Sequence, residues 1–201
     1  MLTGMTTRRT PTGAAVLQPD VTYAITEAVI DELADHGFGR LSMEAVAKRA
    51  GVGKSALYRR WPSKDEMIGA VIAEFSVARA VDPDTGSLRG DIRATLEALY
   101  EWITHPRFSR IFPGLIAEAR RNPAMAEFAR HTIGGPRRAI NRAVFTRAIE
   151  RGEIPADTDV EMALDMGAGI IYWRLIVRGA SVEEGYLDQV TDLVVRALKS
   201  S

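Results

Sequence analysis

The sequence contains no cysteine among its 201 residues. This absence excludes disulfide bonds and cysteine-ligated zinc, and it fits a reducing cytoplasm. Histidine is also scarce: only His36, His105 and His131 occur, with no spacing typical of metal ligands and no candidate nucleophile beside them. We therefore expect a protein that is not an enzyme and that has neither a metal site nor a cofactor.

Long apolar runs are missing as well. The longest, residues 162–177, is interrupted by Asp165 and Arg174 and is too short to span a bilayer. The first 19 residues hold an arginine pair, but no apolar run long enough for a signal peptide follows it. The sequence thus favours a cytoplasmic protein without membrane contact, in which residues 1–19 form a flexible arm.

The segment Gly53-Lys54-Ser55 suggests nucleotide binding, because Gly-Lys-Ser ends a phosphate-binding loop. Such a loop needs a glycine five positions before Gly53, where this chain has Lys48, and a buried strand upstream. The upstream apolar residues instead have the i, i+3, i+4, i+7 spacing of a helix: Met43, Val46, Ala47 and Ala50. The nucleotide interpretation fails on both requirements.

Helical spacing recurs along the chain, and no segment alternates as a strand would. Ser63 and Ser181 each precede a glutamate by three residues and so fit capping boxes. The predicted fold class is all-α with about nine helices, at residues 21–36, 43–50, 54–60, 63–75, 88–104, 105–121, 122–151 with a break or kink at Gly134-Gly135-Pro136, 159–178 and 182–199. The clearest loop, residues 82–86, separates two regions at residues 20–80 and 84–199.

The net charge is zero, but its distribution is uneven. From Arg40 to Lys64 there are seven bases and one acid, Glu44, which gives this segment a net charge of +6. The same segment holds two short predicted helices joined at Gly51, of which the second carries bases. This combination predicts a helix-turn-helix unit at about residues 42–61, whose second helix enters a major groove of double-stranded DNA.

Residues 41–72, LSMEAVAKRAGVGKSALYRRWPSKDEMIGAVI, resemble the helix-turn-helix of the TetR family of transcriptional regulators, the tetracycline-repressor-like proteins. The run GVGKSALYRRWPSKDEM matches that family's turn and recognition helix nearly throughout. Residues 84–199 resemble the family's ligand-binding region through TGSLRGDIRATL and ARRNPAMAEF. The resemblance implies an N-terminal three-helix helix-turn-helix DNA-binding domain at residues 20–80. It also implies a helical ligand-binding and dimerisation domain at residues 84–199.

The resemblance also implies roles for single residues in DNA binding. Ser42, Tyr58 and Lys64 match positions that contact phosphates. The positions that face bases or the adjoining backbone are matched by Gly53, Lys54, Ser55, Ala56 and Arg59. Gly53 and Ala56 stand where the family often has a hydroxyl-bearing residue, so base recognition is expected to depend on the other three. Whether Arg40, Arg49 and Arg60 join this surface or are ordinary solvated residues stays open.

The last two predicted helices are candidates for a dimer interface. Residues 159–178 are apolar nearly all round, and Gly167 and Gly169 allow close backbone approach. The final helix repeats apolar residues at heptad-like spacing: Leu187, Val190, Val194 and Ala197. Burial within one chain would also explain the pattern. We expect a homodimer, because a two-turn recognition helix contacts few bases and two copies can pair on a palindrome.

An inducer pocket is expected among the helices after the DNA-binding unit. The candidates by position are Trp102, Phe108, Phe112, Met125, Phe128, His131, Trp173 and Arg174. For any one of them an ordinary core position is an equally good explanation. As a set they predict a small lipophilic inducer of unknown identity, with His131 or Arg174 as its polar anchor.

The predicted function is a ligand-responsive DNA-binding transcriptional regulator, a repressor that a small-molecule inducer releases from a palindromic operator. The alternative is a non-catalytic module that retains the fold and binds a small molecule or a protein.

Overall fold

A computed structural model describes residues 18–199, which form helices with turns and loops between them and no strand. The elements are α1 (Pro19–Arg40), α2 (Met43–Arg49), α3 (Lys54–Tyr58), α4 (Lys64–Val77), α5 (Leu88–Thr104), α6 (Phe108–Arg121), α7 (Pro123–Ala129), the π-helical turn η1 (Arg130–Gly134), α8 (Gly135–Glu150), α9 (Val160–Tyr172), the π-helical turn η2 (Trp173–Val177) and α10 (Tyr186–Lys199). Because α7, η1 and α8 are continuous, and α9 continues into η2, the described residues contain nine helical segments. The all-α prediction is confirmed. The predicted arm lies outside the described residues apart from Gln18 and Pro19, at the start of α1.

Local sequence signals fix the ends of the N-terminal helices. Gly37 adopts a φ of 73° and breaks the last turn of α1, a conformation that is strained for residues with a Cβ. Gly51, with a φ of 67°, makes the turn between α2 and α3. The Ser42 hydroxyl accepts a hydrogen bond from the backbone N–H of Ala45 at 3.1 Å, and Ser63 caps α4 in the same way. These ends are the ones that the sequence predicts.

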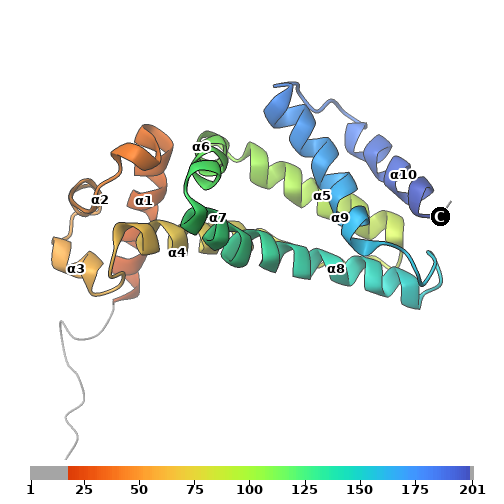
Figure 1. Ribbon diagram of the computed structural model, residues 1–201, viewed down its shortest axis with the longest axis horizontal. Coiled ribbons are helices and arrows are strands. Elements are labelled where there is room, and N and C mark those ends of the chain that lie inside the picture. Colours follow the sequence, from red (N-terminus) through yellow and green to blue (C-terminus); the bar gives the residue numbers. More distant parts are fainter. Residues whose placement is uncertain (1–17, 200–201) are drawn as a thin grey trace, which may run out of the picture.

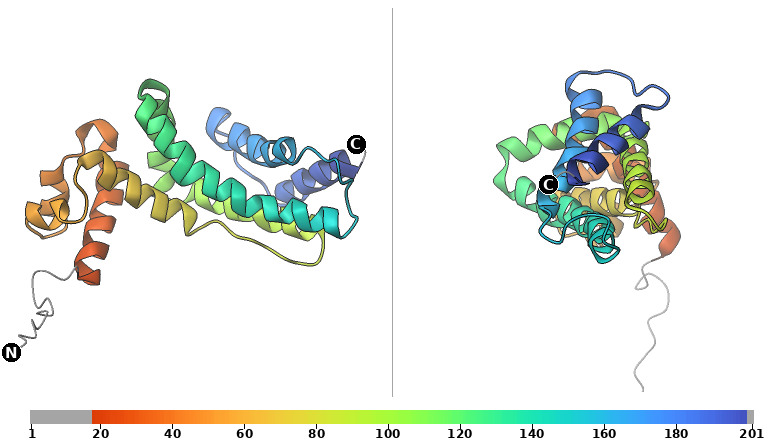
Figure 2. Two further views of the ribbon diagram at one scale, coloured as in Figure 1. Left: turned by 60° about the horizontal axis from the view of Figure 1, so that its bottom comes forward. Right: turned by 90° about the vertical axis from the view of Figure 1, so that its right-hand side faces the viewer.

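The helices are arranged in an elongated molecule (Figure 1). Helices α1 to α4 gather at one end, and α5, α8, α9 and α10 lie towards the other, with α6 and α7 between them. The continuous α7–η1–α8 segment runs from the first group to the far end, as both figures show (Figure 2). The helix-turn-helix and the last two helices therefore occupy opposite ends of the molecule.

The core is continuous between these two ends. Buried side chains from α1 through α10 form one cluster, with α1 packed on α6 and α4 packed on α7 and η1. Gly69 of α4 permits this packing, because a Cβ there would lie 2.5 Å from the Phe128 ring of α7. Arg107, just before α6, donates a hydrogen bond to Glu27 of α1 at 2.8 Å. The division into domains at residues 20–80 and 84–199 stays a prediction.

The structure corrects the predicted start of the last helix. Helix α10 begins at Tyr186, so the capping box predicted at Ser181 does not form. Arg174 of η2 instead donates to the Ser181 carbonyl oxygen at 2.5 Å and pairs with Glu183 at 3.1 Å. These contacts hold the segment before α10 as a loop, and Gly185, with a φ of 79°, ends it.

The predicted interruption at Gly134-Gly135-Pro136 takes the form of a π-helical turn, since η1 ends at Gly134 and separates α7 from α8. The chain passes through η1 into α8 with helical backbone angles at both glycines, and the Gly135 N–H donates to the carbonyl of Arg130, five residues earlier. Pro136 has no N–H, and a proline is tolerated at the first turn of a helix. The helix is therefore widened at this point and is not ended. At α3 the correction is smaller, since the helix ends at Tyr58 and not at residue 60.

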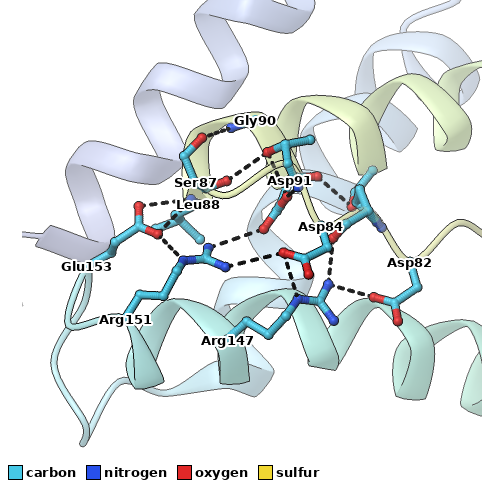
Figure 3. A network of polar contacts seen from close by, with 12 residues as sticks. Asp82, Asp84, Ser87, Leu88, Gly90, Asp91, Arg147, Arg151 and Glu153 are labelled. Atoms are coloured by element: carbon cyan, nitrogen blue, oxygen red, sulfur yellow. Dashed lines mark hydrogen bonds and ion pairs between the residues drawn. The ribbon is translucent and has the colours of Figure 1, made fainter.

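A polar network fastens the loop before α5 to the end of α8 (Figure 3). Asp91, in the first turn of α5, is fully buried and accepts hydrogen bonds from the backbone N–H and the hydroxyl of Thr85, at 2.6 and 2.8 Å. Arg151 lies 3.2 Å from the other oxygen of Asp91 and 2.6 Å from Glu153, whose carboxylate accepts the Leu88 N–H at 2.9 Å. These partners compensate for the burial of a charged group.

Replacing Asp91 by alanine is expected to lower the free energy of unfolding by about 1–3 kcal/mol, because the part-buried Thr85 N–H and Arg151 both lose the buried carboxylate that accepts from them. Urea unfolding followed by circular dichroism measures the change. Asp165→Ala is the matched control: Asp165 pairs with Arg138 at 2.6 Å, but this pair is exposed, and exposed pairs contribute at most about 1 kcal/mol. Equal effects of the two substitutions would contradict a supporting role for the network.

Candidate nucleic-acid interface and ligand cavity

Helix α3 divides its side chains between the core and the surface. Leu57 is fully buried, and Tyr58 is 53% exposed although it is a large aromatic residue. The exposed residues of α3 and its C-terminal cap are Lys54, Ser55, Tyr58 and Arg59. Ala56 does not belong to this face: its side chain is only 7% exposed and packs in the core, which corrects its predicted place among residues that face bases.

Three further predicted DNA contacts lie at helix starts. Ser42, the exposed N-cap of α2, accepts one hydrogen bond through its oxygen and keeps its O–H to donate. Gly53, the N-cap of α3, is exposed and has no side chain to cap the helix. Lys64 is half-buried at the first position of α4. Helix starts favour anions, so the Ser42 hydroxyl is suitably placed for a phosphate.

Lys54 and Glu44 form an ion pair between α3 and α2, with 2.7 Å between Nζ and Oε2. Their hydrogen bond, supported by charge attraction, raises the pKa of Lys54 and lowers the pKa of Glu44. Both side chains are more than half exposed, so water screens the attraction. Lys54 can therefore exchange Glu44 for another anion.

Two arginines of the basic segment hold the helix-turn-helix together. Arg49 of α2 donates to Glu32 at 2.7 Å and to Asp35 at 2.9 Å, both on α1. Arg60 donates to the Thr22 hydroxyl of α1 at 2.8 Å. These side chains tie α2 and the residues after α3 to α1, so Arg49 and Arg60 are not ordinary solvated residues.

A cavity of about 350 Å³ lies between α5, α6, α7, η1, α8 and α9, a size typical of small-molecule sites. Of the eight predicted pocket residues, Trp102 and Phe112 line it, with ring centroids 5.4 Å apart. Its other walls are mostly aliphatic. The polar lining comes from α8: Arg137, Arg138 and Asn141.

The other six predicted pocket residues lie outside this cavity: Phe108, Met125, Phe128, His131, Trp173 and Arg174. Phe108 is buried in the core, where it stacks on Trp102 at 4.4 Å. The side chain of His131 is 73% exposed, and Arg174 is occupied by the loop before α10. Neither of the two polar anchors expected from the sequence faces the cavity.

Arg137 is the most buried of the polar cavity residues that the sequence analysis did not single out. It is 8% exposed, donates to the Ser76 carbonyl oxygen of α4 at 2.5 Å, and places its guanidinium 4.1 Å from the centroid of the Trp102 ring. Burial lowers the pKa of Arg137 to about 10, so the group is still cationic at neutral pH. The run GGPRRAINR is as charged as a solvated face, and no local signal tells which arginine points inward.

The sequence matches two parts of one known family. Residues 25–71 match "Bacterial regulatory proteins, tetR family", and residues 82–194 match "Tetracyclin repressor-like, C-terminal domain". The chain is 32% identical over 180 residues to the uncharacterized HTH-type transcriptional regulator YdeS of Bacillus subtilis, covering 88% of this chain and 87% of YdeS. This chain belongs to the TetR family of transcriptional regulators.

Further relatives agree with the TetR assignment. The DNA-binding transcriptional repressor TetR of Mycobacteroides abscessus is 27% identical over 176 residues, which cover 87% of this chain and 92% of that protein. The crystal structure of the TetR family transcription regulator SCO0332 superimposes with a TM-score of 0.71 at 29% identity, covering 88% of this chain and 97% of that one. As a TetR-family member, the protein is a DNA-binding transcriptional regulator and not an enzyme.

Within residues 18–199, no helix is both long and apolar enough to cross a membrane. The same residues hold no cluster of three or more histidine, aspartate or glutamate side chains arranged for a metal ion.

TetR-family regulators function as dimers, but most residues predicted for the interface are buried inside this chain. In α10 these are Leu187, Val190 and Val194. Gly167 of α9 lies against Leu96 of α5, 3.0 Å from where its Cβ would be. Gly169 is exposed and Ala197 is half-buried, so only these two keep access to a partner. The heptad-like pattern of α10 marks the face that packs on its own domain.

Other apolar side chains of the same helices are exposed. Large hydrophobic residues that face solvent on α9, η2 and α10 are Met162, Trp173, Val177 and Leu193. Three of the four lie within residues 159–178, where the sequence is apolar nearly all round. An apolar helix with one buried face leaves such a surface for a further contact.

Proposed function

We propose that this TetR-family regulator is a repressor that binds a palindromic operator as a homodimer and leaves it when a small lipophilic inducer enters the cavity. The observation that carries the proposal is the exposed face of α3. There, cationic and hydroxyl groups project from a helix whose other face is buried, as a recognition helix requires. The similarity to the repressor of Mycobacteroides abscessus supports the direction of regulation.

The contacts with DNA divide by chemistry. Ser42, Tyr58 and Lys64 hold phosphates and position the protein, while Lys54, Ser55 and Arg59 reach towards base edges. Phosphate contacts carry no sequence information directly, whereas base contacts do. Sequence preference is therefore concentrated in one turn of α3, and a second copy of the protein is required to read enough bases.

The second copy covers the exposed apolar residues of α9, η2 and α10. These helices lie at the end of the molecule opposite α2 and α3 (Figure 1). A twofold dimer through them leaves both recognition helices exposed, and two recognition helices on one palindrome match the symmetry of the protein.

Induction follows from how the cavity is joined to α4. The Arg137 side chain lines the cavity and hydrogen-bonds the last turn of α4, and α4 also packs on η1 in the cavity wall. An inducer that binds better when the two recognition helices are wrongly spaced lowers operator affinity by its differential affinity for the two states.

Opposite substitutions in the Lys54–Glu44 pair test the DNA surface. Lys54→Ala is expected to weaken binding and to lower the slope of log affinity against log salt by about 1 per half-site, because a cation is lost. Glu44→Gln is expected to strengthen binding, since it releases Lys54 and removes a carboxylate near the phosphates. Fluorescence anisotropy measures both, on a duplex that the wild-type protein selects from a random pool.

Lys199→Ala, at the exposed end of α10, is the matched control and should leave affinity unchanged. All three variants should keep the wild-type melting temperature. If Lys54→Ala binds like the wild type, or if Glu44→Gln weakens binding, the exposed face of α3 is not the DNA surface.

A further inference from the structure

The charges around the 350 Å³ cavity are unbalanced. Its lining includes two arginines and no acidic residue. Arg138 is compensated from outside the lining, since it pairs with Asp165 at 2.6 Å and also with Glu161. Within the described part of the chain, Arg137 has no carboxylate at ion-pair distance. One buried cation at the cavity therefore lacks a counter-charge.

The partners of Arg137 are neutral. One terminal nitrogen donates to the Ser76 carbonyl, and the guanidinium lies over the face of Trp102. A carbonyl and an aromatic face each attract a cation, but neither carries a negative charge to offset its desolvation. Burial without a carboxylate is the reason that its pKa falls. An anion in the cavity would be stabilised by this buried charge.

Another donor on a residue that lines the cavity also lacks an acceptor, although this nitrogen is itself closed off from solvent. The Nε1 atom of Trp102 is buried and has no hydrogen-bond partner among the described residues. An indole N–H can only donate, so only an acceptor can satisfy it. Asn141, which also lines the cavity, makes no side-chain hydrogen bond within residues 18–199 either and can donate through its amide. The polar part of the wall is rich in donors.

The remaining lining residues are apolar and indicate the chemistry of the larger part of the ligand. Leu99, Leu115, Ile116, Ile133 and Leu164 surround the space together with the ring of Phe112. A wall of this kind favours an aliphatic or aromatic body with little hydrogen bonding. A ligand with two charges, or with an extended polar chain, would leave most of its polar groups without hydrogen-bond partners in this cavity.

We propose that the cavity binds an apolar carboxylic acid, whose carboxylate pairs with Arg137 while its hydrocarbon body contacts the aliphatic and aromatic wall. The inference rests on the inducer site proposed above and specifies the chemical class of the inducer. It replaces the anchors His131 and Arg174, which the sequence suggested, by a cation that the fold buries at the cavity.

The same pairing explains how the site communicates with the DNA-binding unit. Ser76 lies in the last turn of α4, where backbone carbonyls have no partner within the helix. Arg137 supplies one of these missing partners. A carboxylate that draws the guanidinium into the cavity competes with that carbonyl, so acid binding loosens the C-terminal end of α4, the helix that follows α3 in the chain.

Matched acid and amide pairs test the inference by calorimetry on the full chain at neutral pH. The probes are benzoate with benzamide, 1-naphthoate with 1-naphthamide, and octanoate with octanamide. The wild-type protein is expected to bind at least one acid about tenfold or more tightly than its amide. Arg137→Met should abolish this preference and leave amide binding unchanged, and Arg137→Lys should retain part of it.

Arg138→Met is the matched control, because Arg138 lines the same cavity but is already paired; it should keep the preference. Amides that bind as tightly as the acids, no binding by any acid, or a preference that survives Arg137→Met would each overturn the inference. If Arg137→Met fails to fold, the comparison of each acid with its amide on the wild type still decides, because pairing with Arg137 requires a preference for the acid. Arg137→Lys, which keeps a cation, should then retain part of that preference.

Release of DNA, measured separately, distinguishes this inference from the proposed function. Acids that bind through Arg137 but leave the protein on its selected duplex would overturn induction and leave the ligand class standing. A neutral compound that releases DNA equally from the wild type and Arg137→Met would overturn the ligand class and leave induction standing.

Discussion

The affinity of the wild-type protein for its operator is expected to fall about 10³- to 10⁵-fold between 50 and 200 mM salt. This range applies if a dimer neutralises about six to ten phosphates, because each neutralised phosphate releases condensed counterions whose entropy gain shrinks as salt rises. Anisotropy titrations at a series of potassium chloride concentrations give the slope directly.

The chain as a whole has no net charge, so this dependence must arise from the local surface of α2, α3 and the start of α4. Lys54 and Lys64 supply cations there, and Ser42 and Tyr58 supply hydroxyl donors. Two protomers double these contacts. A flat salt dependence would contradict the DNA assignment of this surface and favour a module that uses the fold for another partner.

Val194→Asp is expected to unfold the protein, whereas Leu193→Asp is expected to give a folded monomer. Val194 is 1% exposed inside its own chain, so a carboxylate there has no water and no cation. The effective penalty of several kcal/mol for a buried ion is a large part of a total stability of about 5–15 kcal/mol. Leu193 is the next residue but 48% exposed, so an aspartate there is solvated in the monomer and is buried only when a second copy binds.

Circular dichroism and light scattering after size exclusion separate these outcomes. Trp173→Asp, on η2, is a second test of the same surface and should also give folded monomers that bind the operator weakly. If both surface variants remain dimers, the interface lies elsewhere. A folded dimer of Val194→Asp would contradict the packing of α10 on its own domain.

The sequence was sufficient where the decisive partner lies within a few residues. Ser42 and Ser63 cap helices through backbone N–H groups three residues away, and Gly51 makes the turn that its missing Cβ permits. The helix-turn-helix could be predicted for this reason, as could the exposed positions Lys54, Ser55, Tyr58 and Arg59. The capping box predicted at Ser181 does not form: α10 begins at Tyr186, and the segment before it is bound by Arg174 of another element.

Other features depend on partners far along the chain. Arg49 and Glu32 are 17 residues apart, Arg60 and Thr22 are 38 apart, and Arg137 and Ser76 are 61 apart. A charged residue looks the same in the sequence whether it faces water, an acid of another helix or a cavity. Which of the adjacent arginines at 137 and 138 is buried was decided only when α8 packed against α4 and α5.

Apolar periodicity carries the same ambiguity. The spacing of Leu187, Val190 and Val194 determined that α10 has one buried face, but the sequence alone left open whether its own domain or a second copy covers that face. The packing of α10 on α5 and α9 decided this, and it moved the candidate interface to Met162, Trp173, Val177 and Leu193. The sequence determined the helices, the ends that have local caps or glycine turns, and the family, because local hydrogen bonds and residue spacing encode them. Only the tertiary structure decided what each face contacts, because burial depends on surfaces brought together from distant parts of the chain.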